Sequence, residues 1–475
     1  MSHAASFYID GRWVEPASPT WFEVIDPATE AVVERLALGN ATDVDRAVAA
    51  ARKALPAYAR TPVAERIALL KRIVSVYERR QEDFAQAMRV EMGSPVTASR
   101  KLQVPRAWLH LNQLIDVLRR FPFEEAMGST LVSHEPVGVC GLITPWNWPI
   151  NQIVVKVGPA LAAGCTMVLK PSEYSPLSSL LFAEVLDEAG VPPGVFNLVN
   201  GDGPGVGAAM SAHPDIDMLS FTGSTRAGVL VAKSAADTVK RVAQELGGKS
   251  ANILLDDVNL QDAVTRGVAA CFTNSGQSCS IPTRMLIPRA LMEDAIQIAK
   301  VAAESYRVGP TTDESTQLGP LVNLAQWRRV QTLIQSGIDE GARLVTGGMG
   351  LPEGFEKGYY AKPTVFADVT HEMTIAQEEI FGPVLSMIAY DSEAEAIAVA
   401  NGTHYGLAAY VQSADQQRAR DVARQLQAGA VHLNYPAADF AAPFGGVKRS
   451  GNGREWGEYG LREYLEVKSF VGYGA

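Results

Sequence analysis

The sequence has few cysteines and no long apolar run, and both absences narrow its class. It contains four cysteines, three of them inside the apolar runs VGVCGLI, AAGCTMV and VAACFTN. Their spacing fits no disulfide framework, which predicts free thiols in a reducing compartment. No run of about 18 apolar residues is present, so no membrane span is expected. The start, MSHAASFYIDGRW, lacks the apolar core of a signal peptide. We therefore predict a cytoplasmic protein.

Positive charge and histidine are also scarce. The 42 Lys and Arg residues are outnumbered by 52 Asp and Glu residues, which gives a net charge of -10 without any basic cluster. That balance argues against nucleic acid or an anionic membrane as a partner. The seven histidines form no group with ligand spacing, so no metal site is predicted. With 475 residues, 47% of them hydrophobic, the chain is long enough for two or three globular domains.

The apolar pattern changes along the chain. Residues 1–40 read as short strands and turns, whereas residues 43–119 have a helical period. Within that helical part, Leu69, Leu70 and Tyr77 belong to one apolar stripe, with Lys and Arg on the opposite face. The stripe predicts a helix that packs against a core.

Strands and helices then alternate. A β-hairpin is predicted at residues 121–139, with Gly128 at its turn. Segments such as VGVCGLIT, TMVLKPSE and MLSFTGS predict strands, with helices over 156–163 and 177–190 between them. A second series begins at ANILLDD and runs to about residue 444. Repeating β-α units predict an α/β fold with parallel, doubly wound sheets. The final YLEVKSFVGY alternates like an edge strand, which predicts pairing across subunits.

One cysteine differs from the others. Cys279 lies in NSGQSCS, among small polar residues, directly after an apolar helical run over 263–272. A thiol attacks a carbonyl only as thiolate, so it needs a polar or electropositive setting and an open approach. Gly276 permits close backbone approach, and Ser278 and Ser280 leave room around the sulfur. The alternative is a buried structural cysteine, and the local sequence does not decide between the two.

Two further stretches follow predicted strands, where α/β proteins build their sites. In TPWNWP, two prolines and two tryptophans make a rigid turn that can aim the amide of Asn147; the alternative is a plain turn. In LKPSE, Lys170 and Glu173 are suited to holding ribose hydroxyls; the alternative is a solvated surface pair.

Four glycine-containing stretches complete the set. FTGSTRAG predicts a strand-to-helix turn that suits a pyrophosphate, although it is not a GxGxxG motif. QELGGK places Glu245 at a strand end, as a candidate general base or a structural cap. EEIFGP holds a carboxylate and an aromatic ring in a stiff turn. The glycines from PFGG to SGNGRE indicate backbone packed close to a ligand or another subunit.

Taken together, these stretches resemble the aldehyde dehydrogenase superfamily. The motifs PWNWP, LKPSE, FTGST, QELGGKS, NSGQSC, EEIFGPV and PFGGVKRSGNGRE occur in the family's order, from about residue 7 to the C-terminus. The resemblance implies a Rossmann-like cofactor domain and a catalytic domain, each on a doubly wound open sheet, plus a small β arm for oligomerisation. The expected boundaries are 1–117 with 137–247, 248–449, and 118–136 with 450–475, respectively.

The resemblance also implies roles for individual residues. Cys279 would be the nucleophile and Glu245 the general base, while Asn147 and the Cys279 backbone N–H would bind the oxyanion. Lys156 and Glu455 match proton-relay positions. Cofactor contacts are implied for Ile143, Trp146, Lys170, Ser172, Glu173, Gly203, Gly207, Phe221, Gly223, Ser224, Leu246, Glu379 and Phe381. Substrate contacts are implied for Trp148, Asn151, Gln152, Val155, Ser278, Ser280, Ala438 and Phe444.

The implied reaction is NAD-dependent oxidation of an aldehyde to the carboxylic acid, through a cysteine thiohemiacetal and thioester, in a homodimer or homotetramer. NAD is favoured over NADP because the Glu173 carboxylate accepts bonds from free ribose hydroxyls and repels a 2′-phosphate, although Lys170 weakens that preference. The nearest rival is a CoA-acylating semialdehyde dehydrogenase. The presence of Glu245 favours water rather than CoA as the acyl acceptor. Further rivals are a catalytically inactive structural relative and a plain nucleotide-binding module, which leaves NSGQSC unexplained.

The substrate is indicated by four positions of the resemblance. Val155 stands where relatives that act on short semialdehydes often carry arginine, which argues against a small carboxylate-bearing substrate. Asn151, Gln152, Val155 and Ala438 match positions that are often bulky and apolar in relatives. They predict a wide, partly polar mouth that admits an aromatic or longer aldehyde.

Overall fold

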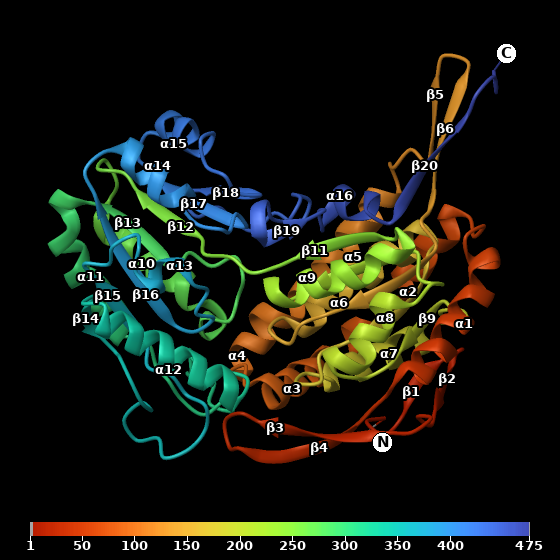
Figure 1. The fold of residues 1–475 in the computed structure, drawn as a ribbon, viewed down its shortest axis with the longest axis horizontal. Coiled ribbons are helices and arrows are strands. Elements are labelled where there is room, and N and C mark those ends of the chain that lie inside the picture. Colours follow the sequence, from red (N-terminus) through yellow and green to blue (C-terminus); the bar gives the residue numbers. More distant parts are fainter. Residues whose placement is uncertain (1–2, 475) are drawn as a thin grey trace.

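The computed structural model describes residues 3–474 and contains two open β-sheets and two small antiparallel sheets. Figure 1 shows the two open sheets in separate lobes, with the strands from β12 to β18 in the second. A narrow arm formed by β5, β6 and β20 extends away from both lobes. The predicted α/β class, with two open sheets and a β arm, is confirmed.

The first sheet is parallel at its centre. Strand β7 has β8 on one side and β10 on the other, so the winding direction reverses beside β7 and opens a crevice at the carboxyl ends of these strands. In spatial order the strands are β19 (Gly451–Asn452), β11 (Arg241–Glu245), β10 (Met218–Thr222), β7 (Val139–Ile143), β8 (Thr166–Lys170), β9 (Phe196–Leu198), β1 (Phe7–Ile9) and β2 (Arg12–Val14).

Helices cover this sheet and form a large apolar core. They are α1 (Ala41–Tyr58), α2 (Val63–Arg79), α3 (Gln81–Met92), α4 (Val96–Ala98), α5 (Val104–Leu118), α6 (Pro149–Ala163), α7 (Leu177–Glu188), α8 (Ala208–Ala212), α9 (Thr225–Ala235) and α16 (Gly457–Arg462). The stripe predicted on α2 is buried: Leu70 and Tyr77 are each 0% exposed.

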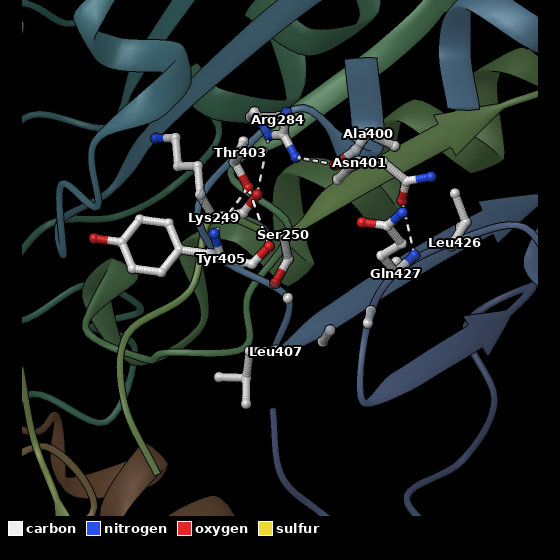
Figure 2. Close-up of a pocket in the computed structure, with 15 residues that line it drawn as sticks. Lys249, Ser250, Arg284, Ala400, Asn401, Thr403, Tyr405, Leu407, Leu426 and Gln427 are labelled. Atoms are coloured by element: carbon white, nitrogen blue, oxygen red, sulfur yellow. Dashed lines mark hydrogen bonds between the residues drawn. The ribbon is translucent and has the colours of Figure 1, made fainter. Parts of the chain in front are cut away.

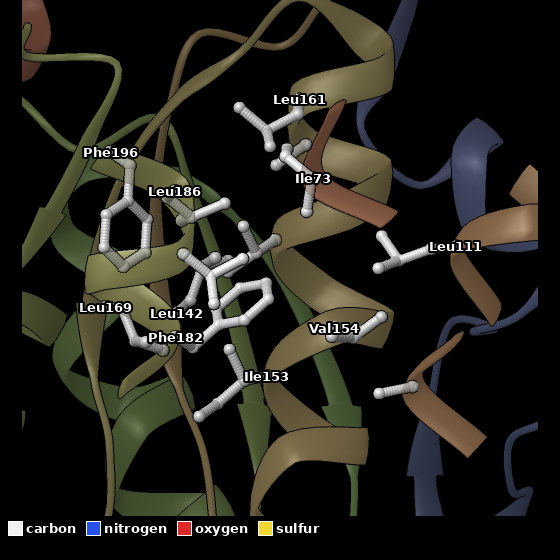
Figure 3. Packing of buried hydrophobic residues seen from close by; sticks show 14 of the residues in the cluster. Ile73, Leu111, Leu142, Ile153, Val154, Leu161, Leu169, Phe182, Leu186 and Phe196 are labelled. Carbon is white, nitrogen blue, oxygen red and sulfur yellow. The ribbon is translucent and has the colours of Figure 1, made fainter. Parts of the chain in front are cut away.

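Helix α6 is the centre of this core. Figure 3 shows Ile73 of α2 and Leu111 of α5 on one side of α6, and Phe182 and Leu186 of α7 on the other. Every residue of α6 is buried. Because full burial of one such aliphatic side chain contributes about 1.5–3 kcal/mol, the helix is held firmly. Its first turn, which begins at Pro149, therefore presents side chains from a rigid support.

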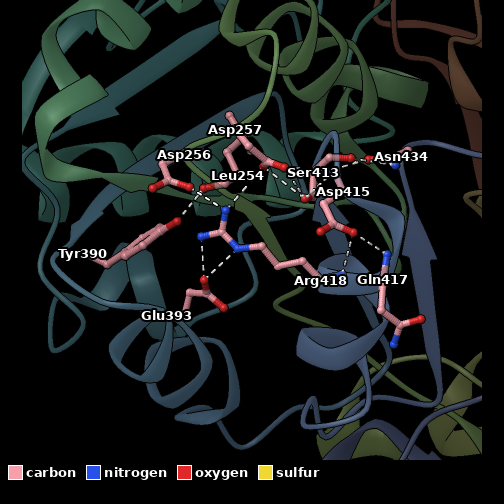
Figure 4. Close-up of polar contacts among 10 residues, drawn as sticks. All are labelled: Leu254, Asp256, Asp257, Tyr390, Glu393, Ser413, Asp415, Gln417, Arg418 and Asn434. Atoms are coloured by element: carbon pink, nitrogen blue, oxygen red, sulfur yellow. Dashed lines mark hydrogen bonds and ion pairs between the residues drawn. The ribbon is translucent and has the colours of Figure 1, made fainter.

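The second open sheet carries the rest of the chain. Its strands, in spatial order, are β14 (Arg343–Thr346), β15 (Thr364–Ala367), β16 (Val384–Tyr390), β13 (Arg284–Pro288), β12 (Ala251–Leu254), β17 (Ala408–Gln412) and β18 (Ala430–Leu433). The helices are α10 (Leu260–Phe272), α11 (Met292–Glu304), α12 (Leu324–Asp339), α13 (Thr374–Gln377), α14 (Glu393–Asn401) and α15 (Gln416–Ala423). Figure 4 shows the Arg418 guanidinium joining α15 to Glu393 of α14 and to Asp256 beyond β12.

The arm is a three-stranded antiparallel sheet. It consists of β5 (Glu124–Met127), β6 (Thr130–Pro136) and β20 (Leu465–Phe470), with β20 at one edge, and Gly128 turns the hairpin with a φ of 61°. A second two-stranded sheet pairs β3 (Thr20–Asp26) with β4 (Ala31–Leu38). The predicted hairpin and C-terminal edge strand are therefore present.

Some predicted boundaries differ from the structure. Helix α6 begins at Pro149, not near 156, because a proline is well tolerated in the first helical turn. Helix α7 ends at Glu188, and Gly190 follows in the left-handed conformation. The domain division remains a prediction, and its end residues 1 and 475 lie outside the described part. Within 450–475, β19 extends the first sheet and α16 packs on α5 and α6.

None of the helices in residues 3–474 combines the length and the apolar character that a membrane span requires.

Candidate active site

The loop that carries Cys279 is set by an unusual backbone. After α10, Asn274 and Ser275 both have a φ of 55° and Gly276 has a φ of 75°. A Cβ on Gly276 would lie 2.0 Å from the Gly382 carbonyl oxygen, so a side chain there would collide with backbone. The close approach expected of Gly276 is therefore real, and it holds the Cys279 loop against the turn that follows Phe381.

The amide of Asn147 is directed at this loop. Its Nδ2 donates to the Gln277 carbonyl oxygen at 3.0 Å, and the backbone carbonyl of Asn147 accepts from Asn274 Nδ2 at 2.8 Å. Gln103 Nε2 donates to Asn274 Oδ1 at 3.0 Å and braces the pair. The residue predicted to bind an oxyanion therefore lies beside the predicted nucleophile, which fits an aimed amide better than a plain turn.

The charges that act on the Cys279 sulfur are negative. Cys279 is half-buried, unlike the other three cysteines, which are fully buried. Burial raises the pKa of Cys279, and the carboxyl groups of Glu379 and Glu245 raise it further. The sequence predicted a polar or electropositive setting, and within residues 3–474 the structure provides a polar one in which the charges acting on the sulfur come from carboxyl groups. The thiol therefore needs a proton acceptor before it attacks.

Glu245 ends β11 as a buried carboxyl group. It is 4% exposed, and neither side-chain oxygen has a hydrogen-bond partner among residues 3–474. Burial, followed by the charge of Glu455, raises the pKa of Glu245 well above its ordinary value. An unpaired buried carboxyl group is costly, so its retention points to a functional partner such as water.

Lys156 and Glu455 form a buried ion pair near Glu245. Lys156 Nζ lies 2.5 Å from Glu455 Oε1 and donates to Ser220 Oγ at 3.0 Å. Lys156 comes from α6 and Ser220 from β10, so the pair lies under the carboxyl ends of the first sheet. The two residues predicted for proton relay are thus brought together and act electrostatically on Glu245.

A cavity of about 490 Å³ opens beside Cys279. It is bounded by the ends of β7 and β10, by the start of α9 and by the turn after α13. Eight residues singled out from the sequence line it: Trp146, Asn147, Gly223, Ser224, Leu246, Cys279, Glu379 and Phe381. The rings of Trp146 and Phe381 meet edge to face, with centroids 5.4 Å apart. Predicted catalytic and cofactor residues therefore share one cavity.

The start of α9 forms one wall of this cavity. Ser224 is the N-cap, and its Oγ accepts from the Ala227 N–H at 3.3 Å. A Cβ on Gly223 would lie 2.6 Å from the Phe221 ring, so the turn is tightly packed. Unpaired N–H groups and the helix dipole make such a start attractive to an anion.

Glu379 reaches this cavity from the second sheet. Its Oε1 accepts from the Gly248 N–H at 3.0 Å, and burial raises the pKa of Glu379 to about 7. Figure 2 shows the buried Arg284 side chain beside Thr403 and Lys249, the residue that follows Gly248. Arg284 donates to the Lys249 carbonyl oxygen at 2.9 Å and to two further carbonyls at 2.8 Å. The glycine-rich loop is thus anchored to the second sheet.

Other predicted cofactor residues do not line this cavity. Lys170 is buried and donates to the Pro171 carbonyl at 2.8 Å and to Glu173 at 3.4 Å, so the pair is not a solvated surface pair. Burial lowers the pKa of Lys170. Ile143 and Phe221 are buried in the apolar core, because strand residues behind the crevice fill the sheet interior. Gly203 and Gly207 bound a π-helical turn, and Ser172 is buried.

The predicted substrate residues lie mostly on the other side of Cys279. Trp148 Nε1 donates to Ser278 Oγ at 3.0 Å, and Asn151 and Gln152 are each 5% exposed. Phe444 stacks on Trp456 at 4.6 Å, and the Ser280 carbonyl accepts from the Tyr410 hydroxyl. Val155 is buried in the core beside His110, and Ala438 is exposed. Aromatic rings therefore accompany the polar side chains of this region, and the wide mouth expected from the sequence stays a prediction.

Several side chains around Cys279 were not anticipated. Gln326, Arg329 and Tyr405 line the large cavity. Arg106, His110, Tyr410, Phe440 and Trp456 lie on the side of Trp148. Trp456 follows the GNGRE motif directly, and that position offered a signal. The others stand on ordinary helical or strand segments without a motif.

Comparison with known proteins agrees with this geometry. Residues 13–470 match the model of the "Aldehyde dehydrogenase family". A 3-succinoylsemialdehyde-pyridine dehydrogenase from Pseudomonas sp. is 54% identical over 474 residues, covering 100% of this chain and 99% of that protein.

Two solved structures are similar along almost their whole length. Aldehyde dehydrogenase C from Pseudomonas syringae, a cysteine-to-alanine variant with NAD+ and octanal, is 55% identical with a TM-score of 0.99 over 100% and 98% of the two chains. An aldehyde dehydrogenase from Mycobacterium tuberculosis with NAD+ is 41% identical with a TM-score of 0.95 over 98% of each chain. The seven motifs, the shared cavity and these matches establish that the chain belongs to the aldehyde dehydrogenase family.

Proposed function

We propose that this protein oxidises aldehydes to carboxylic acids with NAD+ as the oxidant and water as the acyl acceptor. The observation that carries the proposal is a single cavity with Cys279 and Asn147 at one wall and the start of α9 at another. A nucleophile, an oxyanion donor and an anion-binding helix start are the parts that such a reaction needs.

The residues of this cavity fit NAD+. The start of α9 at Ser224 would hold the pyrophosphate, and Glu379 would accept a bond from a ribose hydroxyl. Trp146 and Phe381 would confine the nicotinamide end near Cys279. The similar proteins with NAD+ support this assignment. We expect kcat/KM to be higher with NAD+ than with NADP+, and Glu173, held by Lys170, supports that order.

The chain's own residues would carry out the remaining chemistry. Cys279 would give up its proton to solvent water and its sulfur would bond to the aldehyde carbon, while Asn147 and the Cys279 N–H would hold the resulting oxyanion. Bound NAD+ supplies an acceptor for the hydride that leaves this carbon. Glu245 then takes a proton from water, whose oxygen bonds to the thioester carbon and displaces the sulfur. The raised pKa of Glu245 suits a base that works near neutral pH.

The test separates acylation from deacylation. Wild-type protein is mixed with octanal and NAD+, and NADH absorbance is followed in the first turnover and at steady state. We expect Glu245→Gln to keep the first burst of NADH but to lose steady-state turnover by about 10²–10³-fold, as for loss of a general base. Undiminished steady-state turnover would remove Glu245 from this role. Higher turnover with CoA than without it would favour the acylating alternative.

The substrate class that we propose is an aromatic or longer-chain aldehyde. The rings of Trp148, Phe444 and Trp456 support it, since they offer apolar surface beyond Cys279. The name of the 54% identical relative specifies a semialdehyde carried on a pyridine, and the 55% identical relative was crystallised with octanal. A panel of aliphatic, aromatic and charged aldehydes ranks these classes by kcat/KM.

We also propose that the arm mediates assembly into a homodimer or homotetramer. Val467 and Phe470 on β20 and Met127 on β5 are 64%, 40% and 71% exposed. Apolar side chains on an open sheet edge favour pairing with another strand. Light scattering of the wild type and of Val467→Glu measures this directly; a wild-type monomer would contradict the proposal.

A further inference from the structure

The Arg106 guanidinium lies one ring away from the Cys279 loop. Arg106 is in the first turn of α5, and its Cζ lies 4.7 Å from the centroid of the Trp148 ring. The same indole donates through Nε1 to Ser278 Oγ, which belongs to the residue before the nucleophile. One indole therefore separates the cation from the loop that carries the sulfur.

An electrostatic interaction with Tyr410 also relates Arg106 to this loop. The Tyr410 hydroxyl donates to the carbonyl of Ser280, the residue after Cys279, at 3.3 Å. The charges of both Cys279 and Arg106 act on the ionisation of Tyr410. Arg106 and Tyr410 are absent from the lining of the 490 Å³ cavity, although Cys279 is part of it. Arg106 therefore lies on the Trp148 side of the Cys279 loop and outside the lining of that cavity.

The printed contact of this guanidinium is the Trp148 ring, and it has no polar partner among residues 3–474. Within residues 3–474 Arg106 makes no hydrogen bond or ion pair, and its Nε is buried without an acceptor. The buried Arg284, by contrast, donates to three backbone carbonyls. Burial lowers the pKa of Arg106, yet the guanidinium stays charged at working pH. A partly buried cation with unused donors calls for an acceptor from outside the chain.

Two buried polar residues lie near Arg106. The charge of Arg106 acts on His110, and the His110 ring hydrogen-bonds the Asn151 side chain; both residues are at least nine-tenths buried. Gln152, the residue after Asn151, has a buried Oε1 without a hydrogen-bond partner among residues 3–474. His110 is one helical turn from Arg106, and its low pKa of about 3 keeps it neutral. The rings of His110 and Phe440 meet at 4.9 Å beside these atoms. The region thus combines aromatic surface with the Arg106 guanidinium.

We propose that Arg106 is a specificity-determining residue that donates hydrogen bonds to a second oxygen of the aldehyde substrate, a ketone carbonyl or a carboxylate several carbons from the reacting CHO group. The inference rests on the proposed function, because it assigns the far end of the same substrate. A guanidinium offers five N–H donors in a fixed fork, which suits such an oxygen, and the Trp148 face orients that fork. The aldehyde carbon would meanwhile remain within reach of Cys279.

The test compares matched substrates. The probes are 4-oxo-4-phenylbutanal, 4-phenylbutanal, 4-oxobutanoate and octanal, each with saturating NAD+. We expect Arg106→Met to lower kcat/KM for 4-oxo-4-phenylbutanal by about 10- to 100-fold, mainly through KM, as for loss of a hydrogen bond from a charged donor. Values for 4-phenylbutanal and octanal should change less than about threefold. A larger loss for 4-oxobutanoate than for the ketone would identify the carboxylate as the preferred oxygen.

Two control variants separate a loss of substrate recognition from a disturbance of the folded structure. Arg106→Lys keeps the charge without the fork and should give an intermediate loss. Arg35→Met removes another arginine stacked on an indole, Trp21 at 5.4 Å on the β3–β4 hairpin, and should change no substrate. Equal losses for all four substrates in both Arg106 variants, or no loss for either oxygen-bearing probe, would overturn the inference. Wild type that oxidises none of the probes would instead overturn the proposed function.

Discussion

Two polar clusters in this protein differ in how their groups are satisfied. Around Arg418, the guanidinium pairs with Asp256 at 2.6 Å and with Glu393 at 2.5 Å, while Asp257 accepts from Ser413 and the Asp415 N–H. Around Cys279, the carboxylate of Glu245 and the guanidinium of Arg106 have no such partners among the described residues. The first cluster ties secondary-structure elements together. The second keeps its donors and acceptors for molecules that the chain does not contain.

The largest effect on the oxidation rate, and the sharpest test of this comparison, is expected from removing the Cys279 sulfur. Cys279→Ala removes the atom that bonds to the substrate, and NADH formation should fall by at least about 10⁴-fold. The melting temperature should stay close to that of the wild type, because Cys279 is half-buried and anchors no network. Spectrophotometric rates and thermal melts measure both. Retention of more than about 1% of the rate would mean that another group is the nucleophile.

The second largest effect concerns the oxyanion donor. Asn147→Ala should lower kcat by about 10²–10³-fold, the usual loss for one such donor. Because Asn147 Nδ2 also donates to Gln277, some loss of stability is expected. Asn274→Ala removes the neighbouring donor to the same carbonyl and serves as a matched control. If both variants lose the same rate, Asn147 acts by bracing the loop rather than by stabilising charge.

The third effect is on stability and depends on pH. Burial lowers the pKa of His110 from 6.5 to about 3. Between these values the unfolded chain binds a proton that the folded chain does not, so the free energy of unfolding falls as pH decreases. One such group accounts for about 2 kcal/mol between pH 6.5 and 5. Urea melts at several pH values should show a flatter profile for His110→Asn. Parallel profiles would show that folding does not lower the pKa of His110.

The smallest effect is expected in the cluster around Arg418, whose guanidinium has charged partners. Arg418→Ala should lower the free energy of unfolding by about 1 kcal/mol, because its partners are partly exposed and solvent screens the ion pairs. The oxidation rate should be unchanged, since the network lies away from the cavity that contains Cys279. Denaturant melts and NADH assays of the same preparation decide this. If Arg418→Ala lowered the oxidation rate without changing stability, the cluster around Arg418 would be functional rather than structural.

Much of the fold could be predicted because its signals are local. The β-α alternation gave both open sheets, and the alternating C-terminal segment gave the edge strand β20. Much of the 490 Å³ cavity beside Cys279 could also be predicted, since Asn147 and Ser224 stand just after strand ends, as Glu245 stands at the end of β11. In a parallel sheet these ends meet at one edge, whatever the loops between them do.

The other side of the site could not be predicted in this way. Arg106 and His110 look like ordinary polar positions on an amphipathic helix, and their surroundings depend on how α5 packs on α6. The negative setting of Cys279 was missed because Glu379 lies a hundred residues further along the chain. The cofactor roles of Ile143 and Phe221 were assigned by resemblance, and the structure places both side chains in the core.

The left-handed run at Asn274, Ser275 and Gly276 has a mechanical consequence. Because Gly276 packs against the Gly382 backbone, the loop that carries the Cys279 sulfur and the turn that carries Phe381 are held together as one rigid unit. We therefore expect conformational motions that admit or release a large ligand at the opposite wall of the cavity, near the first sheet. Replacing Gly276 by any larger residue would separate these two segments and displace the Cys279 sulfur.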